Sequence, residues 1–558
     1  MSYFYIHIPY FSNDHTQDEL RIIHPINPHW DRYSSIEKNE HELFVFSGFH
    51  TQKNDRDKQD LSSFFRKHYL DAPVKLRGSF AGVYWSKQYS QWLLYTDPLS
   101  TKPLYYAQTK QGWHISNSYD SLAQKIGQQI HLELNPLAVY HVLSYGYSLE
   151  EHTIIKGIYR LPIGHVGVLA SVQKTEFVGP TSELQIRSIY QLPLESYDIG
   201  FDEAAEEVNR LFQQSIHRGF SVDQDMGRQH LVALSGGLDS RMTSWVAHSL
   251  GYTKQTNLTF GQSDSLDKKI AKKISHDLEH QWNFLPLDGG EMLLDMDIIT
   301  KNTGGNVYYY GQAHTHRSLE QVNLNQFGLL HTGMLGDVVL GSYLQTQHNP
   351  TQFPAYSGAS STRFFHKLTE LGFASQYPNE EHHKMMLRGL YGMNMGLLSV
   401  YNKTESYSPF TDLDFFDFCL RLPVKMRANH RLYIHWMKNY YPESTQYIWE
   451  KTRAKVTDKN IKIGSKSMPL NTWLWKVYEK IRFRSSTANP NFMTPIDYWL
   501  STEQNLRLEL DNYAKALLPS ITAENELQNT LHLLYQEGNG IEKVQVITIL
   551  AAAKRYII

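Results

Sequence analysis

Residues 231–244, LVALSGGLDSRMTS, have the residue types and spacing of a polyphosphate site. An apolar run ends at Leu234, and six residues then lead into an apolar helical pattern: Ser235, Gly236, Gly237, Leu238, Asp239 and Ser240. Two glycines let a backbone approach a polyphosphate closely, and the first N–H groups of a helix carry partial positive charge. The serine hydroxyls add donors. A carboxylate such as Asp239 is a suitable ligand for Mg²⁺, which prefers oxygen and bridges phosphates.

The alternative interpretation of this segment is a glycine turn that only starts a helix. A bare SGG would favour that interpretation, whereas SGGxDS between a strand and a helix is much more specific for phosphate. The segment matches neither the GxxxxGK[ST] pattern nor GxGxxG. We therefore predict a phosphate site of a different type.

The elements around this segment alternate between strand and helix patterns. Residues 201–218 have helical spacing with acidic residues in the first turn, 256–261 and 280–287 are predicted strands, and 267–278 is a predicted helix. This alternation predicts an α/β fold with a parallel sheet and right-handed crossovers. Such sheets bind ligands at the carboxyl ends of their strands, where Ser235 lies. The chain beyond about residue 350 is predicted to be mostly helical.

The first 180 residues are rich in strand patterns instead. Short runs such as HELFVFSGF, GSFAGVYW, QWLLYTD and GHVGVLA are separated by turn residues. Residues 180–200 are irregular, with two prolines and no clear period. We therefore predict three parts: a β-rich domain over 1–185, a linker over 186–200, and an α/β domain over 201–558.

Composition excludes several functional classes. The chain has 558 residues, 54 Lys and Arg against 56 Asp and Glu, and one cysteine, Cys419. A net charge of −2 argues against a general nucleic-acid binder. One cysteine excludes a disulfide framework and a CxxC centre, and Cys419 has the setting of a small buried hydrophobe. No signal peptide or membrane span is predicted, so we expect a cytoplasmic protein.

SGGLDS resembles the pyrophosphate loop of class B asparagine synthetases and their relatives, the β-lactam synthetases and lasso-peptide macrolactam cyclases. Further landmarks follow the same order. LRGSFAGVYW (76–85), TDPLSTKPLYYA (96–107) and IIKGIYRLPIGHVGVL (154–169) resemble the N-terminal Ntn-type glutaminase domain of this family. HTGMLGDVVLGSY (331–343) and SYSPFTDLDFFDFCLRLP (406–423) resemble two segments of its synthetase domain. The resemblance implies an Ntn-hydrolase-like α+β sandwich followed by an adenine-nucleotide α-hydrolase-like α/β domain.

The resemblance also implies a reaction and a set of residues. A substrate carboxylate attacks ATP to give an acyl-adenylate and pyrophosphate, and an amine then forms the amide and releases AMP. The implied cofactors are ATP and Mg²⁺, with Asp239 and Asp337 as metal and pyrophosphate ligands. The residues that fall where the family cradles adenosine are Leu234, Phe260, Thr332 and Gly333.

A lysine that stabilises charge on the adenylate is implied as well. In the family it follows a tryptophan after a PE-type turn, and YPESTQYIWEKTRAK offers Lys451 and Lys455, of which Lys451 fits the spacing better. Residues 451–484 hold ten Lys and Arg against two acids. Such a run is either a solvated face or a basic lip that holds polyphosphate or an acidic substrate.

The sequence departs from the family at both predicted sites. Glutamine-using relatives carry cysteine at position 2, where this chain has Ser2, and their Asn-Gly-Glu stretch reads Ser47-Gly48-Phe49 here. We therefore predict an N-terminal domain that does not hydrolyse glutamine. In the segment HTGMLGDVVLGSY (331–343), Met334 and Val338 replace glutamates of asparagine synthetases. A methionine cannot serve as a base, and the candidates left to orient the acceptor are His331, Tyr308–Tyr310, His314 and His316. A metal role for the last two is the alternative.

The leading prediction is an ATP-dependent amide-forming ligase that takes its amine from a source other than glutamine. The substrate is a peptide carboxylate, as in macrolactam formation, or a small-molecule acid of another specialised pathway. A partner protein that delivers a peptide substrate is a further expectation. Two alternatives stay open: an ammonia-dependent asparagine synthetase, and a catalytically silent homologue that acts in binding or assembly.

Overall fold

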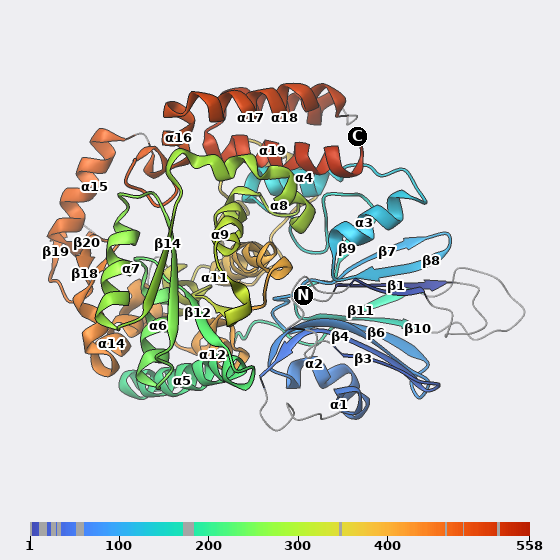
Figure 1. Cartoon of the computed structure of the whole chain (residues 1–558), viewed down its shortest axis with the longest axis horizontal. Coiled ribbons are helices and arrows are strands. Elements are labelled where there is room, and N and C mark those ends of the chain that lie inside the picture. Colours follow the sequence, from blue (N-terminus) through green and yellow to red (C-terminus); the bar gives the residue numbers. More distant parts are fainter. Residues whose placement is uncertain are drawn as a thin grey trace, which may run out of the picture.

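The computed structural model describes residues 3–9, 19–23, 30, 35–51, 61–170, 183–344, 349–463, 466–483, 485–521 and 525–558. Within them, two antiparallel sheets form the N-terminal part and lie to the lower right in Figure 1. One sheet has the order β2-β1-β8-β7-β9 and the other the order β11-β10-β6-β5-β4-β3. The strands of the first sheet are β1 (Tyr3–Pro9), β2 (Glu19–Ile23), β7 (Tyr105–Thr109), β8 (Gly112–Ser116) and β9 (Ile158–Arg160).

The second sheet contains the four strands that the sequence predicted most clearly. These are β4 (Glu42–His50), β5 (Gly78–Ser86), β6 (Gln91–Thr96) and β10 (His165–Ala170), joined at the edges by β3 (Ser35–Lys38) and β11 (Leu184–Ser188). Each inner strand is buried along most of its length, so both of its faces are covered by other parts of the chain. The inner faces of the two sheets share a core, as expected for a sandwich. Helices α1 (Leu61–His68) and α2 (Ala72–Lys75) cover the outer face.

The second part of the chain is built on a parallel sheet with the order β14-β13-β12-β15-β16. Its strands are β12 (Gln229–Ala233), β13 (Gln255–Gly261), β14 (Gln281–Pro286), β15 (Phe327–His331) and β16 (Ser406–Tyr407). Helices α6 (Leu238–Ser249) and α7 (Leu266–Asp277) are successive crossovers in one direction, which places both on one face. The long α5 (Phe201–Asp225) contacts α6 and β15, and α9 (Tyr310–Glu320) packs on β13. The predicted parallel α/β sheet is confirmed.

The division of the chain in space differs in two places from the division predicted along the sequence. Strand β11 continues to Ser188, three residues into the predicted linker, and no helix or strand follows until α5. Helices α3 (Tyr119–Gly127) and α4 (Pro136–Tyr145) fall within the predicted first domain but pack against α8 (Met296–Thr303) and the C-terminal α19 (Gly540–Tyr556) (Figure 1). This packing buries almost all of α4, which the edge of a small sandwich could not do.

The remaining helices complete the core around the parallel sheet. Cys419 lies on α12 (Leu413–Arg421), is fully buried, and has its thiol pKa raised by burial, so the predicted apolar role is confirmed. Helix α14 (Arg431–Tyr440) packs on α5, and α16 (Ile496–Thr502), α17 (Gln504–Leu517) and α18 (Asn525–Glu537) pack on α19 at the top of Figure 1. Among the described residues, no helix is both long and apolar enough to cross a bilayer.

Candidate active site

The SGGLDS loop lies between the carboxyl end of β12 and the start of α6, near the centre of the parallel sheet (Figure 1). Its hydroxyls organise the turn: the Ser235 amide donates to Ser240 Oγ at 3.0 Å, and the Gly237 amide donates to Ser235 Oγ at 3.1 Å. A side chain at Gly236 would approach the Glu450 Cβ to 2.9 Å. Glycine is therefore required at this point because another segment of the chain packs against the loop.

Asp239, in the first turn of α6, contacts the segment 331–343, one of the two segments that resemble the synthetase domain of the family. The amide of Asp337 donates to Asp239 Oδ2 at 2.9 Å, and the Tyr433 hydroxyl donates to Oδ1 at 2.8 Å. A Cβ on Gly333 or Gly336 would lie within 2.8 Å of Asp239 atoms, so this approach requires glycine at both positions. Burial and the nearby Asp337 carboxylate raise the pKa of Asp239 well above its usual value. The two acids, 98 residues apart in the sequence, thus share one site.

The pair of aspartates fits a Mg²⁺ ion by the chemistry of its donors. Both side chains offer hard carboxylate oxygens, which Mg²⁺ prefers. A cation between them would also relieve the repulsion that raises the pKa of Asp239. Bound there, Mg²⁺ would neutralise charge on a polyphosphate.

Lys451 also reaches this site. Its Nζ lies 3.7 Å from Asp337 Oδ2 and 5.5 Å from the ring centre of Trp449, and its side chain is 55% exposed. Lys455 is different: it is exposed on the short strand β18 (Ala454–Lys455), where its backbone amide donates to Asp458. The structure therefore brings Lys451, and not Lys455, to the two aspartates. Which lysine acts in the reaction stays a prediction.

The residues predicted to cradle adenosine lie around the same loop. Thr332 and Gly333 follow β15 directly, and a Cβ on Gly333 would meet the Ser240 amide at 2.4 Å. Phe260, at the end of β13, is partly buried and packs on the His314 ring with 4.5 Å between ring centres. The Leu234 side chain is buried in a small core with Ile274 and Tyr447, so it presents almost no surface to a ligand.

Three further residues hold the loop, and the sequence analysis did not identify them. The buried guanidinium of Arg241 donates to the carbonyl oxygens of Gly236 and Ile448, at 3.2 and 2.7 Å. The Gly236 amide donates to Asp267 Oδ1 at 3.0 Å. Tyr433 is the third. A sequence pattern could have pointed to Arg241, because it directly follows SGGLDS on the buried side of an apolar helix. No pattern along the chain pointed to Asp267 or Tyr433.

Glu450 and His430 complete the surroundings of the site. Burial, with a smaller contribution from Asp267, raises the pKa of Glu450 to about 7. Burial, with a smaller contribution from Lys451, lowers the pKa of His430 to about 4. Asn429 and His430 both have positive φ, 57° and 56°. Left-handed backbone at two successive residues other than glycine is uncommon and tends to occur at functional sites.

The histidines and tyrosines proposed to orient an acceptor are mostly turned elsewhere. His331 is fully buried, donates through Nε2 to the Asp223 carboxylate at 2.7 Å, and stacks on Phe220 of α5. Its contacts are thus with α5, and its role in orienting the acceptor stays a prediction. The Tyr310 hydroxyl donates to the Thr494 carbonyl, and His316 pairs with Glu320. His314 keeps a place near Phe260, and burial lowers its pKa to about 4.

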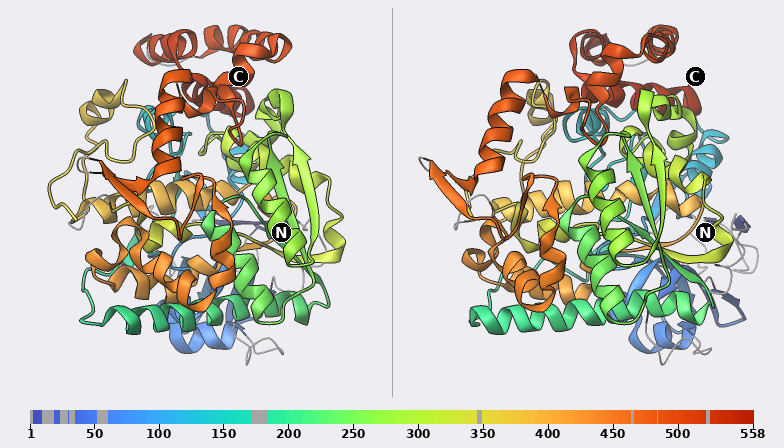
Figure 2. Two further views of the ribbon diagram at one scale, coloured as in Figure 1. Left: turned by 90° about the vertical axis from the view of Figure 1, so that its left-hand side faces the viewer. Right: turned by 60° about the vertical axis from the view of Figure 1, so that its left-hand side comes forward.

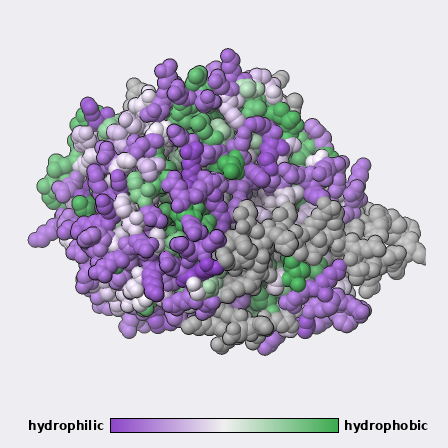
Figure 3. Space-filling model, viewed as in Figure 1, coloured by the Kyte–Doolittle hydropathy of each residue, from purple (hydrophilic) through white to green (hydrophobic). Residues whose placement is uncertain are grey.

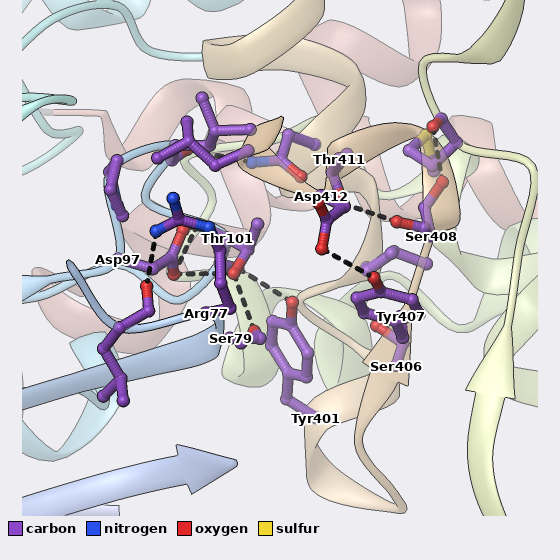
Figure 4. Close-up of a pocket in the computed structure, with 18 residues that line it drawn as sticks. Arg77, Ser79, Asp97, Thr101, Tyr401, Ser406, Tyr407, Ser408, Thr411 and Asp412 are labelled. Carbon is purple, nitrogen blue, oxygen red and sulfur yellow. Dashed lines mark hydrogen bonds between the residues drawn. The ribbon is translucent and has the colours of Figure 1, made fainter. Parts of the chain in front are cut away.

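A small cavity lies between the N-terminal sandwich and the second part (Figure 4). Its volume of about 30 Å³ suffices for a molecule of the size of water or ammonia. Ser79, Asp97 and Thr101 line one side, and Tyr401, Tyr407 and Ser408 line the other, with Met334 also in the lining (Figure 4). Burial raises the pKa of Asp97 to about 6, although the Thr101 hydroxyl donates to it at 2.7 Å.

Residues 47–49, which replace the Asn-Gly-Glu stretch of the family, contribute to the interface between the N-terminal sandwich and the second part of the chain. Phe49 is fully buried and packs on Tyr407, with 6.3 Å between ring centres, in a cluster that joins the two parts. Nearby, Lys102 and Glu405 form an ion pair at 2.5 Å and are both almost completely buried. Burial lowers the pKa of Lys102. Ser2, the other predicted departure from the family, lies outside the described residues.

Comparisons with known proteins agree with this arrangement. Residues 49–178 match the model of a glutamine amidotransferase domain, and residues 207–447 match that of asparagine synthase. A curated relative, asparagine synthetase [glutamine-hydrolyzing] 1 of Bacillus subtilis (strain 168), is 23% identical over 230 residues, which is 40% of this chain and 33% of the relative's length.

Proposed function

We propose that this chain is an ATP-dependent amide-forming synthetase that adenylates a substrate carboxylate with release of pyrophosphate. The observation that carries the proposal is the meeting of Asp239, Asp337 and Lys451 beside the glycine loop. Two acids and one cation, placed at the start of a helix, are what a polyphosphate with its magnesium ion requires. The first amide N–H groups of α6 bind phosphate oxygens, and Lys451 holds its positive charge where negative charge develops as pyrophosphate leaves.

The amine, in this proposal, does not come from glutamine. Phe49 occupies the position of a glutamate in the glutamine-binding stretch and is used in the interface with Tyr407 instead. The small cavity between the two parts of the chain has room for a molecule of the size of ammonia. An amine carried by the substrate itself, as in macrolactam formation, or a separate small amine would reach the adenylate from outside.

Asparagine synthesis is the second candidate, because the curated relative carries that name. In that case the substrate carboxylate is that of aspartate and the amine is free ammonia. Met334 and Val338 weigh against it, since neither offers an oxygen to a polar substrate. Val338 is 3% exposed and belongs to the core, and Met334 lines the interdomain cavity.

The test separates nucleotide binding from carboxylate activation. Calorimetry with Mg²⁺ and a non-hydrolysable ATP analogue should give binding for the natural chain and at least a tenfold loss for Asp239→Ala. The exposed Asp198→Ala, on the segment before α5, is the matched control and should bind normally. Failure of the natural chain to bind the nucleotide contradicts the proposal and favours a silent homologue.

Exchange of labelled pyrophosphate into ATP then identifies the carboxylate. L-Aspartate, small organic acids and peptides with free carboxylates are tested in parallel. Exchange with aspartate alone, followed by asparagine formation with ammonium, would establish the second candidate. Release of ammonia from glutamine would contradict the proposed source of the amine.

A further inference from the structure

Residues 459–463 and 466–483 form an arm that projects from the body of the molecule beside the candidate active site. It consists of a hairpin, β19 (Asn460–Ile463) and β20 (Lys466–Pro469), followed by helix α15 (Leu470–Arg482). The arm lies at the left edge of Figure 1, and both views of Figure 2 show the hairpin reaching outward. The family match to asparagine synthase ends at residue 447, so the arm lies beyond it.

Helix α15 exposes an apolar face that nothing in the described chain covers. Thr472 is its one buried residue. The apolar face consists of Leu470, Leu474, Val477, Tyr478 and Ile481, which are between 50% and 80% exposed. Their spacing of i, i+4, i+7, i+8 and i+11 places them on one stripe of the helix. Green side chains mark this edge of the surface in Figure 3. A stripe of this kind indicates an interaction site.

The charges around the stripe have one sign. The sequence from Lys459 to Phe483 has six basic residues and one acid, Glu479. Lys480 lies on one flank of the apolar stripe and Arg482 on the other, by helical spacing, and both are exposed. The complementary surface is therefore apolar with acidic edges.

The base of the arm is bonded to the turn that carries Lys451. The Thr472 hydroxyl donates to the carbonyl of Thr452 at 2.5 Å. The guanidinium of Arg453 lies 3.3 Å from the ring centre of Trp475 on α15. The two residues that follow Lys451 thus hold the helix. By helical spacing the apolar stripe faces away from Thr472, so its occupant binds to an element that is anchored to the Lys451 turn.

We infer that the apolar face of α15 is the docking surface for a polypeptide with an acidic amphipathic segment, which presents the carboxylate to be adenylated. This inference rests on the proposed function and deepens it. A polypeptide is favoured over a lipid surface because the arm is joined to the Lys451 turn, where a carboxylate has to arrive. The stripe is also only about 17 Å long, which suits one short helix.

The experiment places a photo-crosslinking amino acid at Val477 of the full chain in cells of the source organism. The crosslinked polypeptide is identified, purified and tested for stimulation of pyrophosphate exchange. We expect at least tenfold stimulation by that polypeptide. Leu474→Asp with Ile481→Asp, or Lys480→Glu with Arg482→Glu, should remove both crosslink and stimulation, while Leu508→Asp, an equally exposed change on α17, leaves both intact.

Three results would overturn the inference. They are the absence of any polypeptide crosslink, binding only to vesicles of phosphatidylcholine and phosphatidylserine, and a crosslink only to a second copy of the chain. Nucleotide binding, measured by calorimetry on the same arm variants, should be unchanged. If the natural chain did not bind the nucleotide at all, the proposed function would be wrong. Failure of the docking inference and failure of the proposed function are therefore distinguishable.

Discussion

Lys451 and Lys455 are four residues apart, yet only Lys451 reaches the acidic pair. A lysine that lies close to developing negative charge contributes more than one farther away, because the attraction between charges falls with distance. The turn at 451–453 directs the two side chains to different places. The spacing after Trp449 favoured Lys451, but the contact with Asp337 depends on the fold.

Replacement of each lysine by methionine tests this difference. We expect Lys451→Met to lower the rate of pyrophosphate exchange by about 10²–10³-fold, the size found for loss of one charge-stabilising donor. Lys455→Met should change the rate less than about twofold. Equal losses in the two variants would contradict the assignment.

Glu450 makes the site sensitive to pH. Burial raises the pKa of Glu450 to about 7, so the folded chain holds this proton over a range where an unfolded chain has lost it. The stabilising effect of the proton is complete at pH values below the ordinary pKa and is lost as the pH rises toward 7. Above that, a negative charge lies next to Gly236, under the proposed phosphate site.

Glu450→Gln should remove this dependence. We expect the affinity of the natural chain for Mg²⁺ and ATP to fall between pH 6 and pH 8 relative to that of the variant, and its unfolding free energy to fall likewise. Calorimetry and urea unfolding at both pH values measure the two effects. A constant ratio between natural chain and variant would show that Glu450 does not titrate in this range.

At the scale of elements, Arg241 ties the glycine loop to the segment that leads to Lys451. Its guanidinium donates to carbonyl oxygens of Gly236, Ser444, Tyr447 and Ile448. These carbonyls belong to two separate segments, the glycine loop and residues 444–448, so one side chain bonds to both. The relative position of α6 and the Lys451 turn therefore depends on one side chain.

Arg241→Met should separate the two elements. It leaves buried carbonyl groups unsatisfied, which costs about 2–4 kcal/mol of unfolding free energy. Residues 444–451 should also exchange their amide hydrogens faster than in the natural chain. Arg210→Met, on the exposed side of α5, is the control and should change stability by less than about 0.5 kcal/mol.

At the scale of the whole molecule, the N-terminal sandwich and the synthetase part are joined by buried groups. The Lys102–Glu405 pair is 0% and 2% exposed, and Phe49 packs on Tyr407 beside the cavity. Helices α3 and α4 also share a core with the C-terminal helices. The two parts are therefore expected to unfold together.

Glu405→Gln tests this coupling. A lysine left charged and unpaired in the interior costs about 3–5 kcal/mol, whereas the double change with Lys102→Met should recover most of the loss. Urea unfolding of the three proteins measures it, and calorimetric scans show whether one transition becomes two. A single variant as stable as the natural chain would mean that the pair does not hold the parts together.

The order of local elements was predictable because it depends on neighbouring residues. The strand ending at Leu234, the glycine turn, the helix after it and the strand–helix alternation through Pro286 follow from periodicity and turn chemistry. The burial of Cys419 followed from the apolar pattern around it. The pairing of Asp239 with Asp337 was implied only through the family resemblance, since no local rule links residues that far apart.

The sequence by itself determined the loop that can hold a polyphosphate and the two-domain order of the chain. The tertiary structure decided which side chains meet at that loop: Tyr433, Asp267 and Glu450 arrive from distant segments, while His331 faces α5. The physical reason is that chain spacing sets local backbone geometry, whereas convergence depends on how helices and strands pack. The same packing left the apolar face of α15 uncovered beside Lys451, which no pattern along the chain could reveal.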